Sequence, residues 1–190
     1  MKKLLSKSIE FIKKVNINII IASTALFISI CTLIVLVQEV RIMRVQQKAS
    51  MYPYLTIGKV YNSKGFGITL KNSGNGLAKI NSYQIYNDSV YFKDWFDILQ
   101  VLAPESKKID YSIISTEGNI RDEMVTPDEE VNLIFLEWTD ETRILEKRIN
   151  SLRIKICYSS LLDDHWQVNQ SAPQEMDDAC ILEIEKEFGS

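Results

Sequence analysis

IIIASTALFISICTLIVLV, the run from Ile19 to Val37, divides this 190-residue chain into two chemically different parts. The run is nineteen residues long and holds no charged side chain. As a helix it would rise about 1.5 Å per residue and reach about 28 Å, close to the thickness of a bilayer's hydrocarbon core. A cleavable signal would end in a small-x-small site, whereas Gln38-Glu39-Val40-Arg41 follows here. We therefore predict a retained transmembrane helix over residues 17–38, with the lipid bilayer as its partner.

Both flanks of this run have helical patterns. Residues 1–16 place Leu5, Ile9 and Ile12 at helical spacing among five lysines, which is typical of a basic amphipathic segment in the headgroup region. Residues 39–51 consist of good helix formers without glycine or proline. They predict a short helical stalk, and residues 52–190 follow as one domain.

Charge separates the two parts as well. Residues 1–50 carry eight basic and two acidic side chains, a net +6, and the remaining 14 basic and 23 acidic residues give −9. Five lysines before the apolar run against three basic residues after it favour an N-terminus on the cytoplasmic side. The acidic domain argues against general nucleic-acid binding, which needs clustered positive charge.

Within the apolar run, Thr24, Cys31 and Gln38 recur every seven residues. Heptad spacing keeps side chains on one seam of a helix bundle, and small or hydroxylated residues favour such seams in lipid. The pattern predicts a homo-oligomer, and in its sharpest form these three residues line a narrow pore. The alternative is that the hydroxyl groups of the run bond back to the preceding helical turn in an isolated span.

From Tyr52 onward the pattern alternates between apolar and polar residues, which predicts short β-strands. SGNG, at residues 73–76, predicts a hairpin turn whose glycines supply positive φ angles. YFKDWFDILQVL, residues 91–102, predicts a short helix. The segment between Trp138 and Leu152 predicts a helix or a loop. ACILEIEKEF, residues 179–188, predicts an eighth strand or a terminal helix. The predicted strands cover residues 54–61, 66–72, 77–86, 107–114, 129–138, 152–160 and 165–170.

Seven or eight short strands in about 140 residues indicate a mainly β domain, an antiparallel sandwich. The succession YPYLTIG, ITLKNSGNGLAKI, LAPES and LRIKICYSSLLDDHW resembles bacterial single-pass membrane-anchored β-sandwich domains of immunoglobulin-like type, most without assigned function. The most specific part of the resemblance is Leu70, Asn72, Gly74, Gly76, Ala78 and Ile80. The resemblance implies a fold and a location in the bacterial inner membrane, and it implies no catalytic residue.

The cysteines pose a question about compartment. Cys31 lies in the apolar run, whereas Cys157 and Cys180 fall in the domain and are either two buried thiols or a disulfide. A disulfide would place the domain in an oxidising compartment.

The sequence shows no catalytic, cofactor or metal motif. The single histidine, His165, follows Asp163 and Asp164, but adjacent residues on a turn point in different directions, so a solvated turn that enters a strand is expected. The aromatic residues Tyr91, Phe92, Trp95 and Phe96 are expected to pack in a core, and the alternative is that they form a ligand or partner surface.

We therefore expect a non-enzymatic membrane protein that oligomerises through its helix and carries a sensing or interaction head for an unknown ligand or protein partner. By analogy, it resembles small membrane-disrupting effectors of bacterial antiphage defence. The alternative is a passive, membrane-tethered scaffold of the cell envelope.

Overall fold

The computed structural model describes residues 17–104, 114–116 and 118–189 of the chain. The chain divides into two compact units, one ending at Gln47 and the other beginning at Lys48. The predicted basic segment over residues 1–16 lies outside the described residues.

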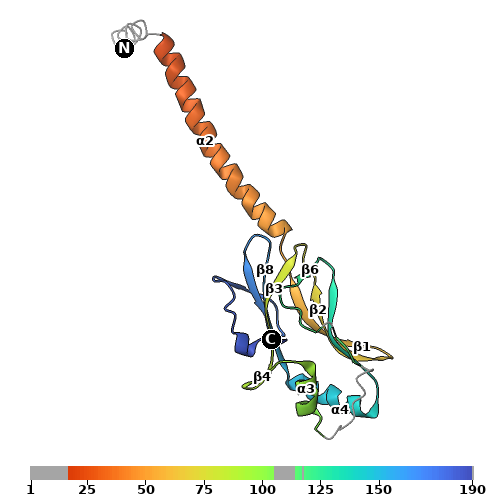
Figure 1. Ribbon diagram of the computed structural model, residues 1–190. Coiled ribbons are helices and arrows are strands. Elements are labelled where there is room, and N and C mark those ends of the chain that lie inside the picture. The colour runs from red at the N-terminus through yellow and green to blue at the C-terminus, as the bar shows by residue number, and fades with distance from the viewer. Residues whose placement is uncertain (1–16, 105–113, 117, 190) are drawn as a thin grey trace, which may run out of the picture. The chain divides into compact units, whose positions relative to one another are not determined.

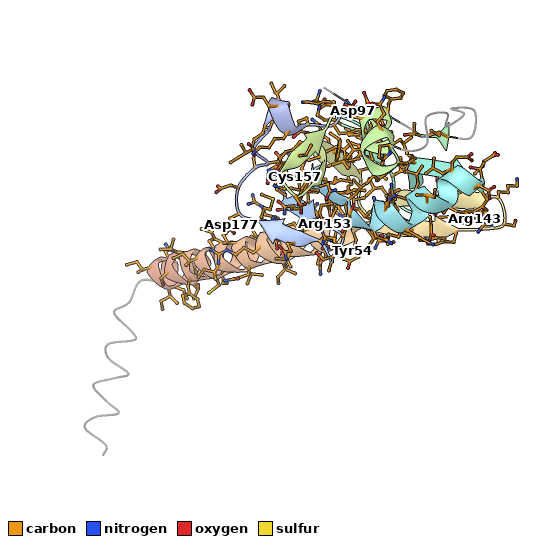
Figure 2. The ribbon with its side chains drawn as sticks, turned by 90° about the horizontal axis from the view of Figure 1, so that it is seen from below. Tyr54, Asp97, Arg143, Arg153, Cys157 and Asp177 are labelled. Carbon is orange, nitrogen blue, oxygen red and sulfur yellow. A yellow bond between two sulfur atoms is a disulfide. The ribbon has the colours of Figure 1, made fainter. Side chains whose placement is uncertain are left out.

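The first described element, α2, is a continuous helix from Ile17 to Ser50 (Figure 1). No proline or glycine interrupts it, so the helix extends through the residues predicted as a stalk. Within the described part of the chain, it is the one helix long and apolar enough to cross a membrane. Its side chains project on all sides (Figure 2), and none of its residues is buried.

The second unit, which we call the head, is built from two antiparallel β-sheets. This confirms the prediction of a mainly antiparallel β domain. The first sheet has the order β1-β2-β7-β5, and the second β10-β9-β8-β3-β4, with β6 also pairing with β3. The strands are β1 (Leu55–Tyr61), β2 (Gly65–Asn72), β3 (Ala78–Asn87), β4 (Val90–Phe92), β5 (Ile114–Ser115), β6 (Met124–Val125), β7 (Glu130–Glu137), β8 (Arg153–Ser159), β9 (His165–Val168) and β10 (Gln174–Met176).

Both sheets contribute to one hydrophobic core. Apolar side chains from β2 and β7 of the first sheet and from β3 and β8 of the second belong to the same buried cluster. Burial of each large apolar side chain contributes about 1.5–3 kcal/mol. Because no residue of α2 is buried, the head's core is formed without α2. The fully buried members include Leu70, Ile80, Ile85, Ile134, Leu136, Ile154, Ile156 and Tyr158.

Two short helices follow capping signals in the sequence. α3 (Trp95–Leu102) begins after Asp94, whose carboxylate accepts a hydrogen bond from the Asp97 N–H. The helix begins later than the predicted residue 91 because Tyr91 and Phe92 belong to β4. α4 (Asp140–Arg148) begins with a capping box between Thr139 and Thr142. The 3₁₀ turns η2 (Ile149–Ser151) and η3 (Ile184–Lys186) complete the helical elements described.

The prediction of a hairpin at SGNG is wrong. β2 and β3, which flank residues 73–76, belong to different sheets, so this segment carries the chain from one sheet to the other. Neither glycine has a positive φ angle. Gly76 is required for space instead, because a Cβ there would clash with the carbonyl group of Met51; the same holds for Gly74 against Tyr52.

One other expectation changes with the structure, and a further one is left almost untested. Residues 179–188 form neither a strand nor a full helix: they run irregularly, with η3 as their only regular turn among the residues described. The predicted strand over residues 107–114 lies outside the described residues except for Ile114, the first residue of β5.

Candidate functional site

The seam residues of α2 lie exposed along one face of the helix. Thr24, Cys31 and Gln38 are separated by seven residues each, so at 3.6 residues per turn they drift by only about 20° per repeat. The structure holds one copy of the chain, so their role in an assembly stays a prediction.

The hydroxyl groups of α2 bond back to carbonyl oxygens one turn earlier. Thr24 Oγ1 donates to Ile20 O at 2.9 Å, and Ser29 Oγ donates to Ala25 O at 2.9 Å. Ser23 and Thr32 form the same kind of bond. Because these donors are satisfied within the helix, they add little cost to its transfer into lipid.

Sequence reasoning missed a second stripe on α2. Ala22, Ala25, Ser29 and Thr32 follow one another at offsets of three, four and three, the spacing of a and d positions in a heptad. At 100° per residue this small-residue stripe lies about 140° around the helix from the Thr24 seam. The signal that could have found it is the size of the side chains rather than their polarity.

In the head, a hollow of about 390 Å³ with a mixed polar and apolar lining lies beside the second sheet. It brings Asp163 and His165, which are two positions apart in sequence, close to residues far away in the chain. Asn81 Nδ2 donates to Ser159 Oγ at 2.9 Å in its wall. Its polar and sulfur-bearing lining includes Lys79, Asn81, Ser159, Asp163, His165 and Cys180.

His165 lies where the predicted strand over residues 165–170 begins. It is the first residue of β9 and is half-buried, and its Nδ1 atom is buried without a hydrogen-bond partner among the described residues. Asp163 is exposed with a φ of 58°. Within the described ranges, no three His, Cys, Asp or Glu side chains gather into a group that could hold a metal ion.

Cys157 and Cys180 are joined in a disulfide, with their Cα atoms 6.1 Å apart. Cys157 is buried on β8 within the head (Figure 2), and Cys180 is half-buried in the irregular C-terminal segment. The bond spans 23 residues of sequence. Closing a loop of that size stabilises a fold by about 3 kcal/mol.

The aromatic residues near α3 separate into two groups. Phe92 and Trp95 are buried in the core, as expected, whereas Phe96 is 43% exposed and Tyr91 is half-buried. The Tyr91 ring contacts the Tyr86 ring, with 5.2 Å between centroids. These rings therefore do not form one surface.

Two buried tyrosines have strongly shifted acidity. Burial raises the pKa of Tyr83 far above its usual value, and burial also raises the pKa of Tyr158. Tyr158 Oη accepts a hydrogen bond from Leu55 N–H at 3.3 Å. The Tyr83 hydroxyl has no hydrogen-bond partner in the part of the chain that the structure describes.

The fold defines a class of chain in which one long apolar helix precedes an antiparallel β head with its own core. The chain belongs to the family of a domain of unknown function, DUF8453, whose model matches residues 17–184. The match begins at the first residue of α2 and includes most of the head, so helix and head form one shared pattern. Comparison with curated proteins and with solved structures finds no match.

Proposed function

We propose that this protein is a non-enzymatic single-pass membrane protein whose helix assembles copies of the chain and whose head is an interaction module. The observation that carries the proposal is α2 itself. Its uncharged run of nineteen residues has no buried residue, and it continues without a break into a helix of 34 residues. An apolar surface of that length is stable in lipid and costly in water.

The helix is suited to lipid in its polar groups as well. A helix satisfies its own backbone, and the hydroxyl groups of Ser23, Thr24, Ser29 and Thr32 are bonded within it. The family match includes α2, which supports a retained helix over a cleaved signal.

Self-association is proposed through Thr24, Cys31 and Gln38. Cys31 is a free, exposed cysteine, so it reports directly on which face of α2 meets a second copy. We expect mild oxidation of membranes to link two chains through Cys31. A matched control moves the cysteine to the small-residue stripe in the variant Cys31→Ser with Ser29→Cys, and the proposal expects less cross-linking there. The reverse order would assign the contact to the stripe and contradict the seam.

The disulfide supports an orientation for the head. Disulfides persist in oxidising compartments, and the excess of lysines before α2 favours a cytoplasmic N-terminus. We therefore propose an N-terminus inside and a head on the outer side of the bacterial inner membrane. The two arguments are independent because one uses the head and the other uses the flanks.

The head is proposed to bind a ligand or protein partner. It has its own core and a net acidic sequence, and the proposal assigns no catalytic, metal-binding or cofactor-binding residue to it. In the most specific form, binding changes the packing of the helices and permeabilises the membrane, as an effector of antiphage defence would. Membrane potential in cells that overproduce the chain tests this form.

A matched pair of variants makes that test specific. Thr24→Leu, Cys31→Leu and Gln38→Leu together remove the seam, whereas Ala22→Leu, Ala25→Leu and Ser29→Leu together keep it and fill the stripe. Depolarisation by the wild type that only the seam variant abolishes supports a pore. If the wild type never depolarises cells, the pore is excluded and the passive tether remains. The tether is favoured by the internally bonded hydroxyls, which let one helix stand alone in lipid.

A further inference from the structure

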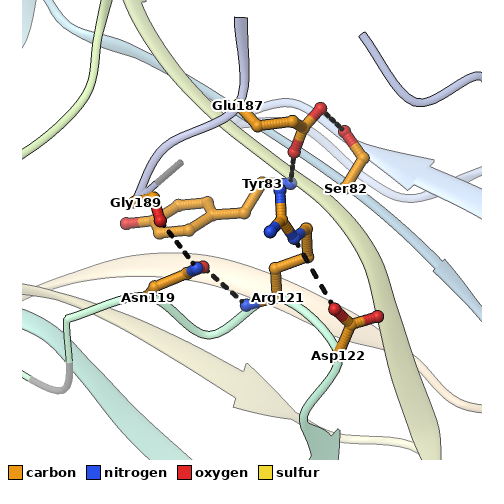
Figure 3. Close-up of polar contacts among 7 residues, drawn as sticks. All are labelled: Ser82, Tyr83, Asn119, Arg121, Asp122, Glu187 and Gly189. Atoms are coloured by element: carbon orange, nitrogen blue, oxygen red, sulfur yellow. Dashed lines mark hydrogen bonds and ion pairs between the residues drawn. The ribbon is translucent and has the colours of Figure 1, made fainter. Parts of the chain in front are cut away.

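Residues 187–189 fill a gap beside β3. Along one edge β3 pairs with β8. Along the other edge it pairs with β6 at Ala78–Lys79 and with β4 at Ile85–Asn87, which leaves Tyr83 between the two. There Tyr83 N–H donates to the Glu187 carboxylate at 2.8 Å (Figure 3). Tyr83 O accepts from Phe188 N–H at 2.8 Å. Residues 187–189, which we call the tail, therefore occupy the place of a neighbouring strand.

The carboxylate of Glu187 is recognised by three donors from consecutive residues of β3. Ser82 Oγ donates at 2.7 Å and Tyr83 N–H at 2.8 Å (Figure 3). Gln84 Nε2 donates at 2.9 Å. Glu187 is completely buried. A carboxylate accepts several hydrogen bonds, so an apolar residue at this position would leave these donors without an acceptor.

The two residues that follow are recognised as well. Phe188 is 2% exposed, and its ring centroid lies 5.1 Å from that of Tyr83 and 5.5 Å from that of Trp95. Gly189 N–H donates to Lys93 O at 2.7 Å, and Gly189 O accepts from Asn119 Nδ2 at 3.2 Å. We call the residues that contact the tail the tail site: Ser82, Tyr83, Gln84, Lys93, Trp95 and Asn119. The site recognises a carboxylate, an aromatic ring and a glycine in succession.

The segment that connects the tail to the head is held mainly at its two ends. At one end Cys180 is bonded to Cys157, and at the other the tail is bound in its site. Between them, the side chains of Ile181, Leu182 and Ile184 are 82%, 49% and 66% exposed. Lys93 Nζ donates to Ile184 O at 3.1 Å. The tail, whose Phe188 is buried in the head's core, thus resembles a ligand on a short tether.

The family match separates the site from its occupant. The match ends at Ile184, so the positions of the tail site fall within the matched range. The tail, residues 187–189, lies beyond it.

We propose that the tail site is a peptide-binding site of the head, and that the tail is a tethered ligand. A segment of another protein displaces it when that segment carries a carboxylate directly followed by an aromatic residue and a glycine. This inference rests on the proposed interaction role of the head and names the surface that performs it. A second copy's tail is the less suitable occupant, because the disulfide and the six residues 181–186 keep each tail near its own site.

The test uses the full chain in detergent micelles and a fluorescent peptide, EIEKEFGS, with the sequence of residues 183–190. A short tether gives the tail an effective concentration of about 1 mM, so it suppresses peptide binding to the wild type. Emptying the site with Glu187→Ala and Phe188→Ala should tighten peptide binding by about 100-fold, if the peptide alone binds with a Kd near 10 µM. Glu185→Ala, which removes an exposed carboxylate two residues earlier, should leave binding at the wild-type level.

The peptide has its own control, in which glutamine replaces the glutamate before phenylalanine and alanine replaces phenylalanine. We expect this control to bind the emptied site at least tenfold more weakly. Equal binding of the two peptides would overturn the proposal. A second result would also overturn it. If the immobilised emptied chain captures wild-type chains by binding the tails of those wild-type chains, the occupant of the site is a second copy of this protein.

Hydrogen exchange of the unmodified chain keeps the proposal testable if the emptied variant does not fold. A displaceable tail predicts that the amides of Phe188 and Gly189 exchange at least 100-fold faster than the β8 amides of Ile156 and Tyr158. Exchange of all four at one common rate would show that the tail opens only with the whole head, which overturns the proposal. Neither measurement needs membrane insertion, so its failure is distinguishable from failure of the anchoring proposal.

Discussion

The side-chain oxygen of Asn72 accepts a hydrogen bond at 3.1 Å from the backbone N–H of Tyr54, eighteen residues earlier in the chain. The same oxygen accepts from Gly74 N–H, and the Asn72 amide donates to the carbonyl oxygens of Gly76 and Val125. Asn72 is completely buried. Its side chain therefore joins the entry to β1, the crossing between the sheets and β6.

Replacement of Asn72 by alanine is expected to destabilise the head by about 3 kcal/mol or more, because it leaves several buried backbone groups without partners. Guanidinium unfolding of the full chain in micelles measures this through fluorescence of the three tryptophans, all of which lie in the head. Asn75→Ala is the matched control, since Asn75 is exposed in the same segment, and it should change stability by less than about 0.5 kcal/mol. Equal effects of the two changes would contradict the role given to Asn72.

A second pair of variants compares two buried hydroxyl groups. Tyr83→Phe removes a hydroxyl that has no partner among the described residues, so stability should stay equal or rise by up to about 1 kcal/mol. Tyr158→Phe removes the acceptor of Leu55 N–H and should lower stability by about 1–2 kcal/mol. Guanidinium unfolding measures the free energy of unfolding of both variants. A larger loss of stability for Tyr83→Phe than for Tyr158→Phe would refute the assignment of an unpartnered hydroxyl to Tyr83.

The raised pKa values of Tyr83 and Tyr158 predict alkaline sensitivity of the head. Above about pH 10 the unfolded chain loses these protons while the folded head retains them, so the unfolded state binds fewer protons and stability falls as pH rises. The stabilisation is fully present below that pH. Each tyrosine contributes a slope of up to about 1.4 kcal/mol per pH unit. Unfolding curves between pH 8 and 11 measure the effect, and Tyr83→Phe should make the slope shallower.

The disulfide predicts a stability difference between oxidised and reduced protein. Cys180→Ser opens the loop and should lower the free energy of unfolding by about 3 kcal/mol, and a reducing agent should do the same to the wild type. After reduction, Cys180→Ser and the wild type should have similar stability. A variant that stays less stable than the reduced wild type would show that packing of the Cys180 side chain, rather than the bond, is responsible.

Local patterns predicted the strands of the head well, and they failed where the answer depended on distant residues. Alternation identifies β1 and β8 within one residue at each end, because it reflects which side chains face the core. The SGNG segment carries a local turn signal, but β2 does not pair with β3, the strand that follows this segment. Besides β1, it pairs with β7, about sixty residues later. No local signal records that partner.

The candidate sites show the same limit. The sequence left Cys157 and Cys180 as thiols or a disulfide, because spacing alone does not fix the distance between two cysteines. The role of Glu187 was not foreseen, since its three donors lie more than one hundred residues earlier in β3. The seam on α2 was readable because a helix converts spacing into a face without any distant partner.

Accessibility of single cysteines to a membrane-impermeant maleimide tests the central claim, that α2 crosses the bilayer, most directly. Cys157 and Cys180 stay bonded and unreactive, so Gln46→Cys and Ser6→Cys, each with Cys31→Ser, report on the two flanks, and the native Cys31 reports on the middle. In spheroplasts we predict labelling of the cysteine at position 46, labelling of position 6 only after the membrane is permeabilised, and labelling of Cys31 only in denaturant. Labelling of all three positions in intact spheroplasts, or of both flanks from one side, would contradict a membrane-spanning helix.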